Sequence, residues 1–158
     1  MLIECVPNFS EGRDRAVIDA ITAEIAHTDG AALLDVDPGR ATNRTVVTLA
    51  GPPAAVLEAA FRAIRKAAEL IDMSKHRGEH ARMGATDVCP FVPMQGATMQ
   101  DCIDLANRLA ERVGDELGIP VYLYGEAARK PERKRLPDIR QGEYEALPKK
   151  LEDPAFAP

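Results

Sequence analysis

The fold is decided by residues 31–50, which run AALLDVDPGRATNRTVVTLA. Residues 31–37 and residues 43–50 are both predicted to be strands, the second because β-branched residues dominate it. Pro38-Gly39 lies between them and is a turn signal. The stretch therefore predicts two sequential strands joined by a tight connection.

The segments on either side of this strand pair alternate between extended and helical patterns. A predicted strand over residues 2–6 precedes a polar stretch that Ser10 opens and that can cap a helix, which Gly30 ends. After the strand pair, a long helix is predicted over residues 54–72 and a loop over residues 73–85. The first helix is predicted from apolar residues at helical spacing: Val17, Ile18, Ile21 and Ile25.

The second half of the chain continues this alternation. Residues 86–92 are a predicted strand that a proline interrupts, and a helix with a capping-box-like start at Thr98 ends at Gly118. Residues 119–124 are predicted to be a further strand. Residues 125–158 are charged and interrupted by prolines, so at most one short helix is expected there.

The resulting order is β-α-β-β-α-β, followed by α-β. Its first six elements predict an α+β fold of the ferredoxin-like sandwich type, with a mixed or antiparallel sheet. Two crossover helices would cover one face of the sheet and leave the other face open and polar. Because side chains alternate along a strand, we expect Leu34 and Val36 under the helices and Asp35 and Asp37 on the open face. Such a face is either simply solvated, or it lines a site or docks a partner.

Composition excludes several functional classes. The chain has 158 residues and a net charge of −5, which argues against a nucleic-acid surface, and aromatic residues make up only 4%. Three cysteines without a close pair form no disulfide framework. The N-terminus has neither a basic region nor a long apolar run, so we expect no signal peptide, no membrane contact and a cytoplasmic location.

Two histidines lie in the loop KHRGEH at residues 75–80. His76 and His80 do not form the zinc-protease pattern, in which the His pair lies on a helix and a Glu directly follows the first His, so no metal is expected. On its own, His80 is either a solvated loop residue or an acid/base. Cys89 lies in an apolar strand and is interpreted as a buried thiol. A basic cluster over residues 129–135 is either a solvated loop or an attractor of polyanionic ligands.

Longer blocks of the sequence carry a resemblance to a known family. The chain resembles the N-terminal subdomain of the glutamate formiminotransferases, including the formiminotransferase half of formiminotransferase-cyclodeaminases. The matching blocks are ordered along nearly the whole chain: ECVPNFSEG at 4–12, LLDVD at 33–37, TNRT at 42–45, GEH at 78–80, RMGA at 82–85, DVCPF at 87–91, PVYLYGEAA at 120–128 and GEYEALP at 142–148.

The resemblance implies an enzyme of histidine degradation. Its members move the formimino group of N-formimino-L-glutamate to N5 of tetrahydrofolate, their co-substrate, and release glutamate. It implies that residues 1–148 are the N-terminal subdomain and that residues 149–158 are a tail leading to a second subdomain. The folate lies in a tunnel between the two subdomains. We therefore expect either a homo-oligomer or a partner chain that supplies the second subdomain.

The resemblance also implies that His80 is the catalytic histidine and that Asp37 works with it. A histidine that titrates near neutral pH can take a proton from the attacking amine and give one to the leaving amine. A carboxylate can orient that histidine and favour its charged form. For substrate binding we expect acids that face a cationic intermediate and groups that meet ligand carboxylates: Asp35, Glu79 and Glu126, and Asn43, Arg44, Arg82 and Tyr124.

Two alternatives remain at this point. The chain could be a non-catalytic half that binds folate or glutamate and needs a second-subdomain partner. It could also belong to a relative that transfers formyl instead of formimino groups, because these one-carbon groups are too similar for the quoted residues to separate.

Overall fold

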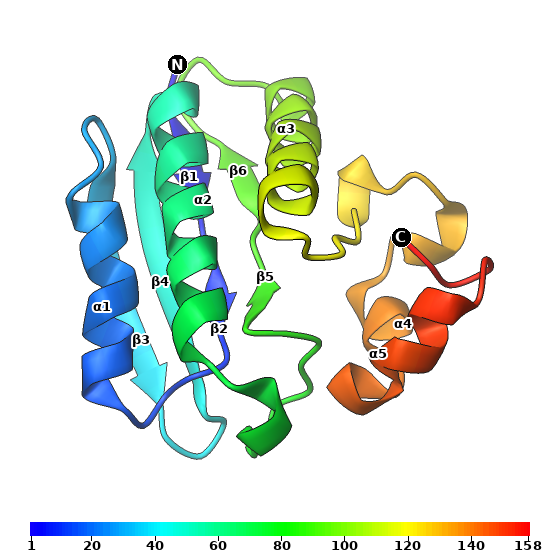
Figure 1. Cartoon of the computed structure of the whole chain (residues 1–158). Helices are drawn as coiled ribbons and strands as arrows, with labels where there is room; N and C mark the ends of the chain where they lie inside the picture. The colour runs from blue at the N-terminus through cyan, green and yellow to red at the C-terminus, as the bar shows by residue number, and fades with distance from the viewer.

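One antiparallel sheet runs through the computed structural model, which describes residues 1–158 (Figure 1). All neighbouring strands in it are antiparallel. Its strands are β1 (Ile3–Cys5), β2 (Asn8–Phe9), β3 (Ala32–Gly39), β4 (Arg44–Gly51), β5 (Thr86–Val88) and β6 (Phe91–Pro93). The structure thus confirms an α+β chain and selects the antiparallel form of the predicted sheet.

Prolines divide two extended segments of the sheet into pairs of short strands. Pro7 separates β1 from β2, and Pro90 separates β5 from β6, because proline has no N–H to donate to a ladder. β1 and β2 both pair with β4, whereas β6 pairs with β1 and β5 pairs with β2. β3 pairs only with β4, so the order across the sheet is β5/β6, β1/β2, β4, β3.

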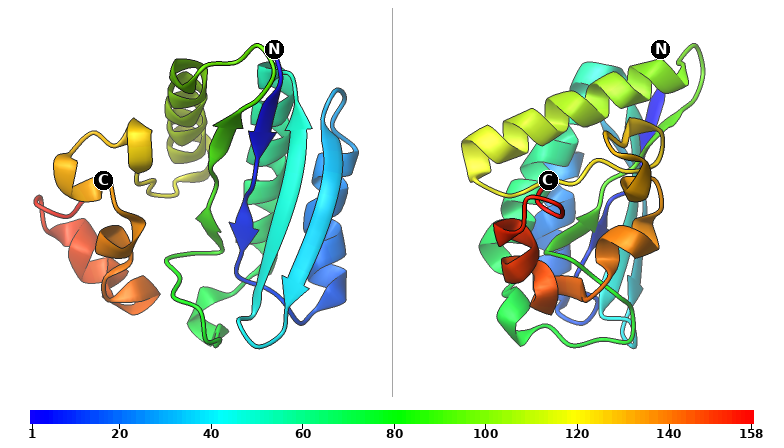
Figure 2. Two further views of the ribbon diagram at one scale, coloured as in Figure 1. Left: turned by 180° about the vertical axis from the view of Figure 1, so that it is seen from behind. Right: turned by 90° about the vertical axis from the view of Figure 1, so that its right-hand side faces the viewer.

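Helices cover only one face of this sheet. They are α1 (Arg15–Ala26), α2 (Pro53–Leu70) and α3 (Met99–Leu117), and the view from behind in Figure 2 shows the strands uncovered on the opposite face. This arrangement confirms the expected open face. None of the helices combines the length and the apolar character that a membrane span requires.

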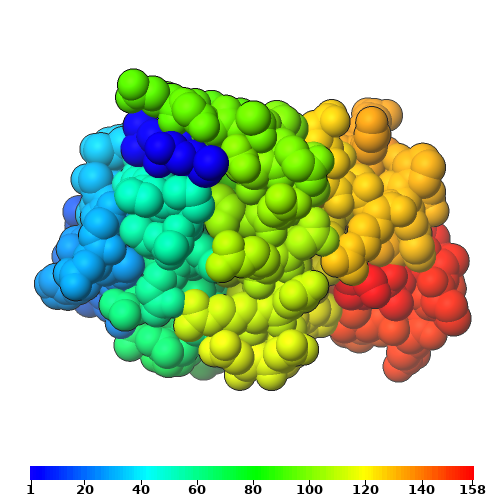
Figure 3. Space-filling view, turned by 90° about the horizontal axis from the view of Figure 1, so that it is seen from above, coloured from blue at the N-terminus to red at the C-terminus, as the bar shows by residue number.

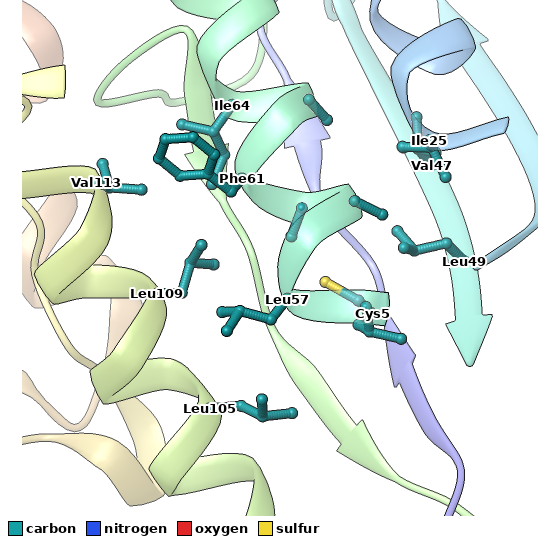
Figure 4. Packing of buried hydrophobic residues seen from close by; sticks show 14 of the residues in the cluster. Cys5, Ile25, Val47, Leu49, Leu57, Phe61, Ile64, Leu105, Leu109 and Val113 are labelled. Atoms are coloured by element: carbon teal, nitrogen blue, oxygen red, sulfur yellow. The ribbon is translucent and has the colours of Figure 1, made fainter. Parts of the chain in front are cut away.

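The hydrophobic core lies between the helices and the covered face of the sheet. Figure 4 shows Phe61 of α2 beside Leu109 and Val113 of α3, while Ile25 of α1 meets Val47 of β4. Phe61 is 1% exposed, and the guanidinium of Arg112 lies 3.8 Å from the centre of its ring. Apolar burial and a cation–π contact therefore both hold α3 against α2.

The predicted ends of α3 are confirmed. The Thr98 hydroxyl accepts from the backbone N–H of Asp101, and the Asp101 carboxylate accepts from the backbone N–H of Thr98 at 2.7 Å. Gly118 ends the helix with a φ of 66°, a left-handed conformation that glycine adopts without a steric penalty. The capping box thus uses Asp in the place of the usual Glu or Gln.

The placement of Leu34 was predicted wrongly. The register shifts between Leu33 and Asp35, so Leu34 falls in a bulge and is 59% exposed. Leu33 pairs with buried Leu49 instead and faces the helices. Because one residue is skipped, Asp35 and Asp37 still lie on the open face, as expected.

Residues 119–124 do not form the predicted strand. Ile119 and Val121 pack against the edge of the core, but no backbone ladder joins this segment to the sheet. Pro120 removes one of the N–H groups that such a ladder would need. The apolar pattern that predicted a strand therefore reflects burial rather than strand pairing.

The C-terminal segment contains more helix than expected. It forms α4 (Leu136–Arg140) and α5 (Glu143–Glu152), preceded by 3-10 turns at Gly125–Ala127 and Pro131–Arg133. Pro137 lies in the first turn of α4, where a missing N–H costs little, so it does not prevent the helix. Figure 3 shows the orange atoms of this segment packed beside the yellow-green atoms of α3.

Truncation of the central aromatic side chain should show where the stability lies. We expect Phe61→Ala to lower the free energy of unfolding by about 3–5 kcal/mol, because it leaves a cavity between α2 and α3. Leu70→Ala on the same helix, where the side chain is 43% exposed, should cost less than about 1 kcal/mol. Urea denaturation measures both values, and equal losses would contradict this description of the core.

Candidate functional site

Three loops meet backbone to backbone at one end of the sheet. A Cβ atom on Gly78 would lie 2.2 Å from the carbonyl oxygen of Thr42, and a Cβ atom on Gly12 would lie 2.1 Å from that of Gly39. The N–H of Glu79 donates to the carbonyl of Ala41 at 3.2 Å. The loop that carries His80 is therefore docked on the β3–β4 turn at residues 40–43. The turn was predicted at Pro38-Gly39, but these two residues pair with β4 as the end of β3.

Asn43 joins these loops through all its polar side-chain atoms. Its Oδ1 accepts from the N–H of Gly12 at 2.9 Å, and its Nδ2 donates to the carbonyl of Arg77 at 3.0 Å. Its φ of 50° is in the left-handed region, which Asn tolerates better than most residues. Asn43 was expected to bind substrate. In this structure its side chain is buried, and both of its polar atoms are hydrogen-bonded to the backbone of neighbouring loops.

His76 extends this network as a buried neutral imidazole. Its Nε2 lies 2.9 Å from the carbonyl oxygen of Asn43, and its Nδ1 accepts from Nε of Arg82 at 3.0 Å. A carbonyl oxygen only accepts, so Nε2 must carry the hydrogen. Both ring nitrogens are thus engaged, and His76 is a structural link between the loop and the start of β4.

Arg82 connects the same loop to α5. Its Nη atoms donate to both carboxylate oxygens of Glu145 at 2.7 and 2.9 Å, and to Glu143 at 3.2 Å. Its Nε binds His76, and a remaining Nη hydrogen reaches the carbonyl oxygen of His76 at 3.3 Å. The hydrogen bonds from Arg82 hold the pKa of Glu145 down at about 2. All the N–H groups of this buried guanidinium are therefore used within the protein.

His80 itself is partly exposed and has one free ring nitrogen. Its Nδ1 lies 2.6 Å from the carbonyl oxygen of Ala81, so Nδ1 donates and the neutral ring keeps its lone pair on Nε2. The carboxylate of Asp37 is exposed on β3 and makes no hydrogen bond or ion pair, with His80 or any other residue. The partnership of His80 with Asp37 is not formed in this structure and stays a prediction.

A second network begins at Arg44, the first residue of β4. Arg44 donates to Oδ1 of Asn8 at 2.9 Å and to the carboxylate of Asp87 at 2.5 Å. The Asp87 side chain is fully buried, and it also accepts from Arg140 of α4 at 2.6 Å and from the N–H of Met83. Two arginines thus compensate one buried carboxylate, and Arg44, like Arg82, is engaged with protein groups.

Tyr124 and Glu126 lie beside a large apolar cavity rather than on the His80 loop. The cavity has a volume of about 720 Å³ and lies between β5/β6, α3 and residues 119–147. Burial raises the pKa of Tyr124 to about 12. Glu126 is exposed and makes no ion pair. The structure therefore divides the expected substrate-binding residues between two places.

The basic cluster over residues 129–135 is partly structural. Arg133 is buried, donates to the carbonyl of Ala157, and lies over the ring of Tyr122 at 5.1 Å. Arg129 donates to Oδ1 of Asn107 at 2.7 Å. Only the other cations of the cluster remain for a polyanionic ligand.

Sequence reasoning missed several residues of this region. Arg40 and Arg77 are exposed on the docked loops and form no ion pair. Arg77 donates one N–H to the carbonyl oxygen of His76 at 2.6 Å, and its other guanidinium N–H groups are available to a ligand. His76 and Glu145 act by tertiary contact, for which the local pattern holds no signal. The one usable signal was Asp87, since an acid within an apolar strand requires a cationic partner.

A methyl group at Gly78 should disturb the docked loop. We expect Gly78→Ala to destabilise the chain by about 1–3 kcal/mol, because its Cβ would collide with backbone atoms of the β3–β4 turn. Gly114→Ala in α3 is the matched control: nothing lies within 4 Å of its Cβ position, so it should be neutral or stabilise by up to about 1 kcal/mol. Thermal unfolding distinguishes the two, and the same sign for both would contradict the docking.

The Arg82–Glu145 pair should give stability a defined pH dependence. A carboxylate whose pKa is lowered on folding stabilises the protein above its unfolded pKa, near pH 4.5, and this contribution is lost as the pH falls towards about 2. Glu145→Gln should therefore lower the urea midpoint at pH 7 and lose this disadvantage progressively below pH 4.5. Glu152→Gln, on the same helix without an ion pair, is the control. A difference that does not change with pH would contradict the assignment.

Comparison with known proteins places the chain in one family. Residues 2–158 match the family model of the formiminotransferase domain, N-terminal subdomain. The chain is 59% identical to the formimidoyltransferase-cyclodeaminase of Gallus gallus, over 99% of this chain and 29% of that protein. It is 48% identical to the glutamate formimidoyltransferase of Streptococcus pyogenes serotype M1, over 99% of this chain and 52% of that protein.

A more distant relative is the formiminotransferase cyclodeaminase-like protein of Arabidopsis thaliana, at 31% identity over 89% of this chain and 48% of that protein. The chain thus spans about half the length of the relatives it matches, or less. Since the family model covers nearly all of its residues, the chain belongs to the formiminotransferase N-terminal subdomain family.

Proposed function

We propose that this chain is the histidine-bearing half of a glutamate formiminotransferase. It transfers the formimino group of N-formimino-L-glutamate to N5 of tetrahydrofolate and releases glutamate, as a step of histidine degradation. The observation that carries the proposal is His80: it lies within the residues that match the family, and its Nε2 is free while Nδ1 donates to the carbonyl oxygen of Ala81. The cytoplasm is the proposed location.

The free Nε2 suits both halves of the transfer. In the first half, N5 of tetrahydrofolate bonds to the formimino carbon, and Nε2 of His80 takes the proton that the attacking nitrogen loses. In the second half, the bond to the glutamate nitrogen breaks, and the same Nε2 returns its proton to that nitrogen. His80 thus takes up and releases one proton in each turnover, and the proposed transfer requires no metal.

Free carboxylates around the loop suit the charge of this reaction. One positive charge passes through the reaction: the protonated amidine and the newly formed tetrahedral intermediate carry it first, and His80 carries it after it takes the proton. Asp35, Asp37 and Glu79 are exposed and make no ion pair, so their charge is not cancelled. We propose that Asp37 supports the imidazolium form of His80 and that the other two acids, with Glu126, stabilise the cationic intermediate.

The arginines divide into two roles. Arg44 and Arg82 would have to give up Asp87 and Glu145 to bind a ligand, so we propose that they position the site. Arg40 and Arg77 carry no carboxylate partner and are the proposed contacts for the carboxylates of glutamate or folate. Asn43 positions the loop, and Tyr124 would contact a ligand only from the cavity side.

We also propose a ferredoxin-like sandwich for this subdomain and a partner for its open face. The connectivity βαββαβ, with strand order β5/β6, β1/β2, β4, β3 and helices on one face, supports the fold. A second subdomain, or another copy of the chain, would cover the open face on which Asp35 and Asp37 lie. The chain's share of its relatives' length, 52% or less, supports a second half.

Substitution of His80 tests the proposed function. We expect His80→Ala to lower the rate of formimino transfer from formiminoglutamate to tetrahydrofolate by about 10²–10⁴-fold, because no other group can shuttle the proton. His27→Ala is the matched control, since His27 is exposed at the end of α1. A folded His80→Ala variant with an unchanged rate would refute the role of His80.

The same assay separates the alternatives. It is run on this chain alone and on a mixture with the second half of the Streptococcus pyogenes relative. Turnover only in the mixture would identify a binding half that needs a partner. The chain covers only 52% of the Streptococcus pyogenes relative, which favours this outcome. Turnover with formylglutamate, but not with formiminoglutamate, would overturn the formimino assignment.

A further inference from the structure

Two cysteines meet at the point where proline breaks the sheet. Cys5 is the last residue of β1, and Cys89 lies between β5 and β6, outside the ladder. Their Sγ atoms are 3.5 Å apart, within hydrogen-bond distance for sulfur. The N–H of Val6 donates to the carbonyl of Pro90 at 3.1 Å and keeps the two segments in register. The strand pairing itself thus holds two thiols together that are 84 residues apart in the chain.

The two thiols differ in their access to solvent. Cys89 was expected to be a buried strand residue, but it lies in the break between β5 and β6, is partly exposed and lines the cavity of about 720 Å³. Cys5 is 0% exposed behind it. Burial, and the hydrogen bond with Cys89, raise the pKa of the Cys5 thiol well above its usual value. A small reagent that enters the cavity therefore meets Cys89 first, and Cys5 is the only thiol in contact with it.

Cys102 provides a comparison within the same cavity. It also lines the cavity wall but is 3% exposed, and its sulfur has no thiol within hydrogen-bond distance. Burial raises its pKa as well. The three cysteines thus comprise one accessible thiol, one buried partner and one thiol without a partner.

We propose that Cys5 and Cys89 form a reversible dithiol–disulfide site that reacts with hydroperoxides. In the first step, the Cys89 sulfur attacks the peroxide oxygen. The O–O bond breaks, Cys89 becomes a sulfenic acid, and water or an alcohol leaves. In the second step, the Cys5 sulfur bonds to the Cys89 sulfur and displaces hydroxide, which leaves as water with the Cys5 thiol proton. The two cysteines together lose two electrons to the peroxide, and an external thiol returns them.

The disulfide would act on the structure next to the proposed site. An S–S bond is about 2 Å long, so the two sulfur atoms need to approach by roughly 1.5 Å. The bond would tie β1 covalently to the β5–β6 connection, which begins one residue after Val88 and two residues after the buried Asp87. Oxidation would thus reach the Arg44–Asp87–Arg140 network and the cavity wall that Tyr124 shares.

Peptide mapping of the oxidised chain tests the proposal. The reduced 158-residue chain is treated with hydrogen peroxide, its remaining thiols are alkylated, and it is digested without reduction for mass spectrometry. We expect a cross-linked peptide that contains Cys5 and Cys89, an alkylated Cys102, and loss of the cross-link on treatment with dithiothreitol. Cys102→Ser should give the same cross-link, because Cys102 takes no part in the reaction.

The order of the two steps is tested with Cys5→Ala. Without its partner, Cys89 should stay at the sulfenic acid stage long enough to be trapped by dimedone, or go on to sulfinic acid. A cross-link between Cys89 and Cys102, or an alkylated Cys89 in the wild-type chain after peroxide treatment, would overturn the proposal. The wild-type map decides the matter even if Cys5→Ala fails to fold, and it does not depend on transferase activity.

Discussion

The left-handed Asn43 is the point on which the arrangement of the loops depends. Its side chain binds the loop before α1 and the loop that carries His80, and its carbonyl accepts from His76. His76 in turn accepts from Arg82, which binds α5 through Glu145. The next residue, Arg44, starts a parallel connection through Asp87 to α4. Two neighbouring residues at the start of β4 thus fasten both C-terminal helices to the sheet.

This polar end of the molecule is held in a different way from its core. The helices pack on the sheet by apolar contact, which tolerates exchange among side chains of similar volume. The networks of Asn43 and Asp87 tolerate less, because removal of one partner leaves a buried donor, acceptor or charge unpaired. Such networks hold their groups in one arrangement. The loop that carries His80 depends on that support, since it has no ladder or core of its own.

Much of the fold follows from periodicity, and the errors have identifiable causes. The β-branched run of β4 and the apolar stripe of α2 were predictable, because burial repeats in step with each element. The exposure of Leu34 was not predictable, because one bulge reverses the alternation of buried and exposed side chains along β3. In residues 119–124 apolar character reports burial without pairing. In the site, His80 and Asp37 came from the family resemblance, and the positioning roles of His76, Asp87 and Glu145 depend on contacts between distant segments.

The distribution of paired and free charges indicates how the site works. Arg44 forms an ion pair with Asp87, and Arg82 forms one with Glu145. These two arginines therefore contribute rigidity rather than attraction for a ligand. Asp35, Asp37 and Glu79 make no ion pair, so under the proposed function their charge would favour a cationic intermediate but repel the carboxylates of glutamate and folate. A substrate that is cationic at its reacting carbon and anionic at its ends needs both signs of charge at separate places. Arg40 and Arg77 supply some positive charge at the loop, and a second surface facing the open sheet would supply the remainder.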